Sequence, residues 1–152
     1  MERRLGGVEA GGTKFVCVIG QDDGTILTRE RFPTRDPERT LGDMRDFFRS
    51  VTADGPPLAG IGVAAFGPLE LRTEHPNFGS LGVTPKAGWS HVDLLGPLRE
   101  FGAPLAIDTD VNGAALAEGR WGAAQGCDQF VYITVGTGIG GGAIVDGRPV
   151  HG

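Results

Sequence analysis

Three glycine-containing or acidic segments carry the residues that could bind phosphate or accept a hydroxyl proton. The first, Glu9-Ala10-Gly11-Gly12-Thr13-Lys14, lies between two short apolar stretches. Paired glycines let backbone N–H groups approach phosphate oxygens, while Thr13 and Lys14 add a hydroxyl donor and a positive charge. An ordinary hairpin turn explains the same local pattern, so phosphate binding at this segment is a hypothesis that depends on the other two.

The second segment is Val135-Gly136-Thr137-Gly138-Ile139-Gly140-Gly141-Gly142, which follows an apolar stretch at 130–135. It contains a G-x-G-x-x-G spacing, which also occurs in dinucleotide-binding folds. Those folds need a helix directly after the turn, whereas residues 141–147 have the pattern of a strand and a hairpin turn. Two glycine loops that each join two strands instead suggest two sides of one polyphosphate site.

The third segment contains Asp108 and Asp110, where an expected strand is followed by an alanine-rich helix. A carboxylate at this place can accept a hydroxyl proton, and α/β folds usually hold ligands beyond strand ends. We prefer Asp110 as the base because it lies just outside the apolar run, and Asp108 is the competing candidate. Asp110 or Asn112 could equally act as the N-cap of the helix, and this alternative stays open.

The elements that must position these residues describe a mixed α/β fold with a sheet of the five-stranded type and flanking helices. Stretches 7–10, 15–19 and 26–32 predict an antiparallel meander, because short turns separate them. Asp36 as N-cap and Pro37 at the first helical position predict a helix that extends to Val51. Further expected elements are strands at 59–66, 105–108, 130–135 and 142–145, helices at 92–101 and 112–121, and a long loop from 67 to 91.

Composition narrows the class of partner and the number of domains. A chain of 152 residues forms one ordinary core, and its net charge of −5 without a Lys/Arg cluster argues against nucleic acid or an anionic membrane as partner. The first residues lack the apolar run of a signal peptide or membrane span, so we expect a cytoplasmic protein. Cys17 and Cys127 are not spaced as metal ligands, and we expect both to be buried thiols.

Together the three segments, in this order, resemble the ROK family (repressors, open reading frames, kinases), within the actin- and hexokinase-like ATPase fold. Two further stretches, Ala65-Phe66-Gly67-Pro68 and Thr84-Pro85-Lys86-Ala87-Gly88-Trp89, resemble the fructokinase branch of that family. The resemblance implies a ribonuclease H-like, actin-like ATPase lobe. It also implies an ATP-dependent sugar kinase whose substrate is a hexose, with fructose as the first candidate.

The resemblance assigns roles to residues of this chain. It implies ATP and Mg²⁺ as cofactors and Asp110 as the catalytic base, with no metal ligand among these residues. The implied contacts with the ATP phosphates are Gly11, Gly12, Thr13 and Lys14 on one side and Gly136, Thr137, Gly138 and Gly140 on the other. The implied sugar contacts are Gly67, Pro68, Lys86, Gly88, Trp89 and Asn112; packing of the loop is an alternative role for Trp89.

Two departures from the family pattern bear on these expectations. Thr109 stands where many members carry Asn, which agrees with the fructokinase branch. The family's zinc site, further sugar contacts and adenosine-binding lobe normally lie beyond the position of Gly152, so residues 1–152 correspond to an amino-terminal lobe, and zinc and a possible homodimer belong to a full-length form. The alternatives are a non-catalytic lobe that needs a partner, a kinase of glucose, mannose or N-acetylhexosamine, and a sugar-sensing regulator.

Overall fold

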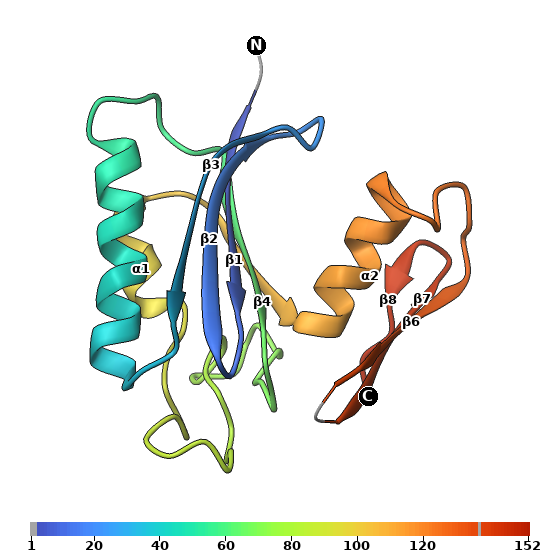
Figure 1. Cartoon of the computed structure of the whole chain (residues 1–152). Coiled ribbons are helices and arrows are strands. Elements are labelled where there is room, and N and C mark those ends of the chain that lie inside the picture. The colour runs from blue at the N-terminus through green and yellow to red at the C-terminus, as the bar shows by residue number, and fades with distance from the viewer. Residues whose placement is uncertain (1–2, 137) are drawn as a thin grey trace.

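The computed structural model describes residues 3–136 and 138–152 and contains two sheets (Figure 1). The first has the strand order β3-β2-β1-β4-β5, and the second has the order β6-β7-β8. The elements are β1 (Arg4–Ala10), β2 (Lys14–Gln21), β3 (Ile26–Pro33), α1 (Pro37–Thr52), β4 (Gly60–Ala65), the 3₁₀ helix η1 (Gly96–Phe101), β5 (Leu105–Thr109), α2 (Asp110–Trp121), β6 (Phe130–Val135), β7 (Ile139–Val145) and β8 (Arg148–Pro149). The expected mixed α/β fold with a five-stranded sheet is confirmed.

Strand β1 lies at the centre of the first sheet, with one antiparallel and one parallel neighbour. It is antiparallel to β2 and parallel to β4, and β4 is in turn parallel to β5. Strand β2 is also antiparallel to β3, so the expected β1–β2–β3 meander is confirmed. Alternate residues of these strands point to opposite faces, and one face packs against α1. The core on that side includes Val8, Phe15, Cys17, Ile19, Val63, Met44, Phe47 and Phe48.

Helix α1 begins where its local signals predict. The Asp36 carboxylate accepts a hydrogen bond of 3.0 Å from the backbone N–H of Arg39, and Pro37 occupies the first turn. This pairing satisfies one of the N–H groups that a helix start leaves without an internal partner.

Among the described residues no helix is long and apolar enough to cross a membrane.

The helix expected at 92–101 is wrong, because η1 covers only Gly96–Phe101. Pro97 lacks a backbone N–H and disfavours helical geometry at Gly96, so a helix cannot run through this pair but can begin at it. The Asp93 carboxylate accepts hydrogen bonds from the N–H groups of Leu95 and Gly96, which holds the preceding residues in a turn.

The two cysteines have different environments, which corrects one expectation. Cys17 is fully buried in β2, and burial raises the pKa of its thiol to about 12. Cys127 is exposed in the turn between α2 and β6, where its backbone N–H donates to the carbonyl of Ala124. A connection that turns at the surface leaves its side chains in water, so Cys127 is not a buried thiol.

The described residues cover only one face of the second sheet. Helix α2 packs against the face that contains Gly142, where an added Cβ would lie 2.6 Å from the Val111 carbonyl oxygen. The opposite face exposes a row of large apolar side chains whose relative exposures run from 62% to 80%: Val131, Ile133, Val135 and Ile139. We call this row the apolar face of the second sheet.

Candidate active site

Asp110 is the first residue of α2 and follows β5 directly. The N-cap is Thr109, whose hydroxyl oxygen accepts a 3.3 Å hydrogen bond from the backbone N–H of Asn112. The alternative in which Asp110 or Asn112 caps the helix is therefore wrong. Asp110 is exposed, and its carboxylate accepts one local hydrogen bond, from the N–H of Val111. Its second carboxylate oxygen has no partner among the described residues.

Asp108 is held by several donors and is the weaker candidate for the base. One of its oxygens accepts hydrogen bonds from Thr109 N at 2.7 Å and from Asn112 Nδ2 at 2.8 Å. The other oxygen lies 2.8 Å from Nε2 of His151. A carboxylate with both oxygens engaged would have to break a hydrogen bond before it accepted a substrate proton, so the geometry favours Asp110.

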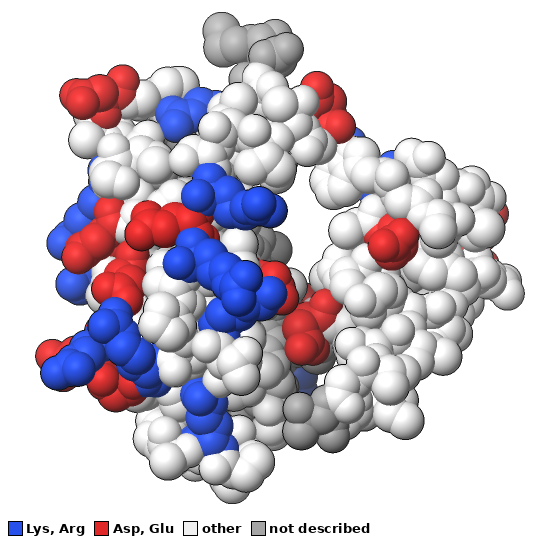
Figure 2. Space-filling model, viewed as in Figure 1, with Lys and Arg blue, Asp and Glu red and all other residues white. Residues whose placement is uncertain are grey.

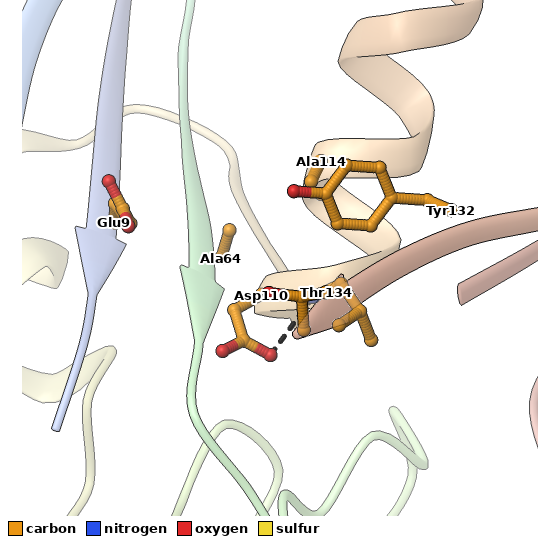
Figure 3. A pocket seen from close by; sticks show the side chains of 8 residues that line it. Glu9, Ala64, Asp110, Ala114, Tyr132 and Thr134 are labelled. Atoms are coloured by element: carbon orange, nitrogen blue, oxygen red, sulfur yellow. Dashed lines mark hydrogen bonds between the residues drawn. The ribbon is translucent and has the colours of Figure 1, made fainter. Parts of the chain in front are cut away.

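One cavity of about 390 Å³ brings together residues from β1, β4, α2 and β6. It is lined by Glu9, Ala64, Asp110, Val111, Gly113, Ala114, Tyr132 and Thr134, and Figure 3 shows their side chains around the shared space. We call it the acid cavity, because the carboxylates of Glu9 and Asp110 both border it. Neither carboxylate has an ion-pair partner in residues 3–136 and 138–152.

Glu9, Tyr132 and Thr134 are site residues that sequence reasoning missed. Glu9 alternates with the buried residues Val8 and Ala10, so its side chain must point to the face opposite α1, toward α2. That alternation, next to a glycine turn, was the available signal for Glu9. Tyr132 and Thr134 lie on the side of β6 opposite to the exposed Val131, Ile133 and Val135. Their neighbours across the cavity could not be known without the tertiary fold.

The first glycine turn has a geometry that suits an anion. The N–H of Gly11 donates to the Lys14 carbonyl at 2.9 Å, and a Cβ at Gly11 would lie 2.7 Å from that oxygen. The hydroxyl of Thr34 donates to the Gly11 carbonyl and fixes the turn from outside. Among the described residues the N–H groups of Gly12 and Thr13 have no hydrogen-bond acceptor. Such free donors can bind phosphate oxygens.

The second glycine turn is shorter than the sequence suggested. The N–H of Gly136 donates to the Gly138 carbonyl at 2.8 Å, and Thr137 lies outside the described residues. Gly140 belongs to β7 opposite Thr134, and a Cβ there would lie 3.2 Å from a Val111 methyl, so Gly140 serves strand packing and is not part of the turn. The β6–β7 and β1–β2 turns lie at the same end of the molecule (Figure 1).

The predicted sugar contacts are not brought together as a group. Asn112 is 5% exposed and lines a cavity of about 650 Å³, the second cavity, with Glu70, Arg72, Asp108 and His151 among its other residues. Arg72 donates hydrogen bonds to Glu70 and lowers the pKa of that carboxyl to about 2. Four predicted contacts do not line the second cavity: Gly67, Pro68, Lys86 and Gly88.

Trp89 lies in the core and does not line either cavity. It is 1% exposed, its indole N–H donates to the Arg35 carbonyl at 2.9 Å, and its ring lies 5.7 Å from that of Phe15 and 5.9 Å from that of Phe66. These contacts favour the alternative in which Trp89 packs the loop. The tryptophan therefore positions residues 67–91 against the first sheet.

Comparison with known proteins gives one family and many relatives. The family model described as "ROK family" matches residues 5–152. A fructokinase of Zymomonas mobilis is 48% identical over 97% of this chain, and a fructokinase of Pediococcus pentosaceus is 40% identical over 92%. These matches cover 50% and 47% of the two relatives, so the chain spans about half the length of the curated relatives it matches.

A solved structure of similar fold extends the comparison. A ROK family glucokinase of Streptomyces griseus, in complex with glucose and AMPPNP, has a TM-score of 0.80 and 28% identity, and the match covers 98% of this chain and 46% of that one. The fold is therefore shared with that of a ROK family kinase. Because the family model covers nearly the whole chain, this protein belongs to the ROK family.

Proposed function

We propose that this chain is the amino-terminal lobe, over residues 1–152, of an ATP-dependent hexose kinase, with fructose as the first candidate substrate. The acid cavity carries the proposal, because it places an exposed carboxylate, Asp110, between the ends of β1 and β6, which lead into the two glycine turns. The identity of 48% to a fructokinase supports fructose. The likeness to a glucokinase crystallised with glucose and AMPPNP supports a hexose and a nucleoside triphosphate as the two substrates.

In this mechanism Asp110 accepts the proton of a sugar hydroxyl while that oxygen attacks the γ-phosphorus of ATP. The bond between the γ-phosphorus and the bridging oxygen breaks, and ADP leaves with the electron pair. The free N–H groups of Gly12 and Thr13, with the ammonium of Lys14, stabilise the phosphate charge. Orientation contributes most of the acceleration, because phosphoryl transfer asks for little covalent chemistry from the protein.

The residues of the acid cavity fit a bound Mg²⁺. Mg²⁺ is held by one or two carboxylates together with water and phosphate oxygens, and it does not need a cage of protein ligands. Glu9 and Asp110 supply carboxylates, and no group of three or more His, Cys, Asp or Glu side chains with metal-site geometry occurs among the described residues. We assign Glu9 to the ion and keep Asp110 as base. When bound, Mg²⁺ would neutralise charge on the β- and γ-phosphates.

The remaining features of a complete enzyme fall outside these 152 residues in this proposal. The polypeptide that corresponds to the other half of the relatives supplies the adenosine side of the site and any zinc site. The complete enzyme would work in the cytoplasm, and it could form a homodimer. The isolated chain supplies only one side of the site, so we expect it to show no turnover. A non-catalytic lobe that needs a partner is therefore the second candidate description of these residues.

The test joins this chain to the half of the Zymomonas mobilis fructokinase that it does not match and follows ADP release with fructose, glucose, mannose and N-acetylglucosamine. We expect the highest kcat/KM with fructose. Asp110→Asn should lower kcat by roughly 10²- to 10⁴-fold with little change in KM, because it removes the proton acceptor. Asp108→Asn is the matched control. It should lower the free energy of unfolding, and its effect on kcat should be smaller than that of Asp110→Asn.

Two results would contradict the proposal. One is the absence of turnover with every hexose although the joined protein is folded by circular dichroism. The other is an Asp110→Asn variant whose kcat equals that of the parent protein.

A further inference from the structure

Helix α2 touches the first sheet closely near its beginning. A Cβ added at Gly113 would lie 2.6 Å from the Cβ of Ala64 in β4, so the helix backbone rests almost directly on that strand. A rod that is held at one place can still pivot about it. The direction of α2 therefore depends on what holds its other end, at Trp121, which lies about 16 Å from Asp110 at a rise of about 1.5 Å per residue.

The turn between β2 and β3 contacts this other end of α2. A Cβ added at Gly24 of the turn would lie 2.8 Å from Nε1 of Trp121, the last residue of the helix. The φ angle of Gly24 is 94°, which side chains other than that of glycine rarely adopt. The indole ring therefore rests directly on the backbone of the turn, and glycine is the residue that permits this approach.

Arg120 and Arg3 add polar contacts around the same place. Nη2 of Arg120 donates to the carbonyl oxygen of Asp22 at 3.1 Å, and its guanidinium carbon lies 5.3 Å from the centre of the Trp121 ring. Nε of Arg3 donates to the Asp22 carboxylate at 3.2 Å. Exposed polar contacts of this kind contribute little individually, so the packing of Trp121 on Gly24 is the main contact.

The two contacts of α2 with the first sheet are separated by open space. A cavity of about 620 Å³ lies between Leu116 of α2 and the β2 residues Val16 and Val18. Figure 1 shows the β2–β3 turn reaching beyond the first sheet toward the C-terminal end of α2. In the same view, Figure 2 shows the two parts of the molecule meeting above and below a hollow. The helix is therefore held near each end and not along its length.

On its other side α2 packs closely against the second sheet. A Cβ added at Gly142 of β7 would lie 2.6 Å from the Val111 carbonyl oxygen, and one added at Gly119 would lie 3.0 Å from the Phe130 ring of β6. The interior of a protein is too densely packed for such contacts to slide freely. Helix α2 and the second sheet thus form one unit, whose orientation to the first sheet is set by the two contacts described above.

We propose that the β2–β3 turn is a brace for α2, and that Gly24 and Trp121 are positioning residues for the phosphoryl transfer. The brace fixes the direction of the helix and thereby the place of Asp110 opposite the first glycine turn. A displacement of about 1 Å in a reacting group can lower a rate by about 10²-fold, so a contact far from the site can matter. The effect on rate rests on the proposed function, whereas the contact itself does not.

The kinetic test uses the joined protein and removes the contact from either side. Trp121→Ala and Gly24→Ala should each lower kcat by roughly 10- to 100-fold, the first by removing the ring and the second by displacing it. KM for fructose and for ATP should change by less than about threefold, because the lost alignment matters in the transition state.

Gly102→Ala is the matched control for the backbone at Gly24. Gly102 also has a positive φ, of 65°, but a Cβ there would meet no atom within 4 Å. This variant carries the strain of an alanine in the left-handed region without any contact to α2. It should therefore leave kcat unchanged.

The double variant separates a shared contact from two independent defects. Gly24→Ala should have no further effect on kcat in the Trp121→Ala background, because the added methyl group then has no ring to displace. Rates are measured well below the thermal unfolding midpoint of each variant, so that loss of folded protein does not enter the comparison.

Hydrogen exchange, followed by mass spectrometry, detects the contact without turnover. In the joined protein, Trp121→Ala should speed exchange of the β2–β3 turn by at least about threefold, and Gly24→Ala should do the same for the last turn of α2. Helix α1 should keep its exchange rate in both variants. Gly102→Ala should change neither the β2–β3 turn nor α2.

Three results would overturn the brace and leave the proposed function standing. Faster exchange with an unchanged kcat means that the contact does not position Asp110. Losses of kcat that multiply in the double variant mean that the two residues act separately. Unchanged exchange in both segments means that the turn does not hold the helix. A parent joined protein without turnover would instead overturn the proposed function, and the positioning role would fail with it.

Discussion

Asp108, Thr109 and Asn112 form a hydrogen-bonded group at the start of α2, with His151 bound to it from beyond β8. This group fixes the first helical turn, and Asp110 is part of that turn. The carboxylate of Asp108 therefore serves structure, while that of Asp110 remains available to a substrate. Two acids that are almost adjacent in sequence have different tasks because only one of them has both oxygens engaged.

The role of Asp108 can be measured as stability. Asp108→Ala should lower the free energy of unfolding by about 1–3 kcal/mol, because the amide of Asn112, which is 5% exposed, loses its acceptor. His151→Ala should cost less in the parent chain and nearly nothing in the Asp108→Ala background, since its partner is already gone. Urea unfolding of the two single variants and the double variant gives the coupling, and strictly additive losses would contradict the hydrogen-bonded group.

Sequence reasoning at the residue scale found Asp110 but not its surroundings. The acid follows an apolar strand and opens a helix, and both signals are local. The N-cap could not be assigned, because Thr, Asp and Asn all cap helices and the choice depends on the backbone angles of one residue. Glu9 was missed for a different reason. A glutamate on a strand is usually a solvated side chain, and only the tertiary fold places Asp110 across the cavity from it.

At the scale of elements, local signals were sufficient to predict the start of α1 but not the structure of residues 92–101. Asp36 and Pro37 agree with each other and with the apolar spacing that follows, and the helix begins as predicted. Residues 92–101 have apolar spacing as well, but Gly96-Pro97 lies inside it, and the structure follows the backbone restriction imposed by proline. A stricter use of that restriction would have given the correct start.

Replacing a glycine by alanine should have opposite effects on stability in α1 and in α2. Gly42 lies inside α1, and an added Cβ would meet nothing within 4 Å, so Gly42→Ala should raise the free energy of unfolding by about 0.5–1 kcal/mol. Gly113 lies inside α2, where a Cβ would be 2.6 Å from the Cβ of Ala64 in β4. Gly113→Ala should therefore lower the free energy of unfolding by about 1–3 kcal/mol. Thermal unfolding measures both, and stabilisation by Gly113→Ala would show that α2 does not pack closely on β4.

At the scale of the whole molecule, the pairing of β1 with β4 could not be derived from local pattern. Their register joins Leu5 to Gly60 and Ala10 to Ala65, across more than fifty residues. Periodicity identifies a strand but not its neighbour, so the order of the first sheet beyond the β1–β2–β3 meander was not predicted. The apolar face of the second sheet was also not foreseen. Five of the six residues at 130–135 are apolar or aromatic, a composition typical of a strand buried on both sides, whereas the described residues cover only one side.

The apolar face should govern how the isolated chain behaves. It places Val131, Ile133, Val135 and Ile139 in water, and contiguous apolar patches of this kind promote association. Ile133→Lys should reduce binding of an apolar dye and self-association of the isolated chain, measured by fluorescence and light scattering. Val83→Lys is the control, since Val83 is 75% exposed but lies in a loop outside this row. Equal effects of the two substitutions would contradict a continuous apolar face.

Helix α2 contacts strands of both sheets, including β4 on one side and β7 on the other. Asp110 opens this helix, and the β6–β7 turn lies beside the same end of it, because a Cβ at Gly140 would lie 3.2 Å from a Val111 methyl. Any shift of the second sheet relative to the first would therefore carry the acid and the turn together.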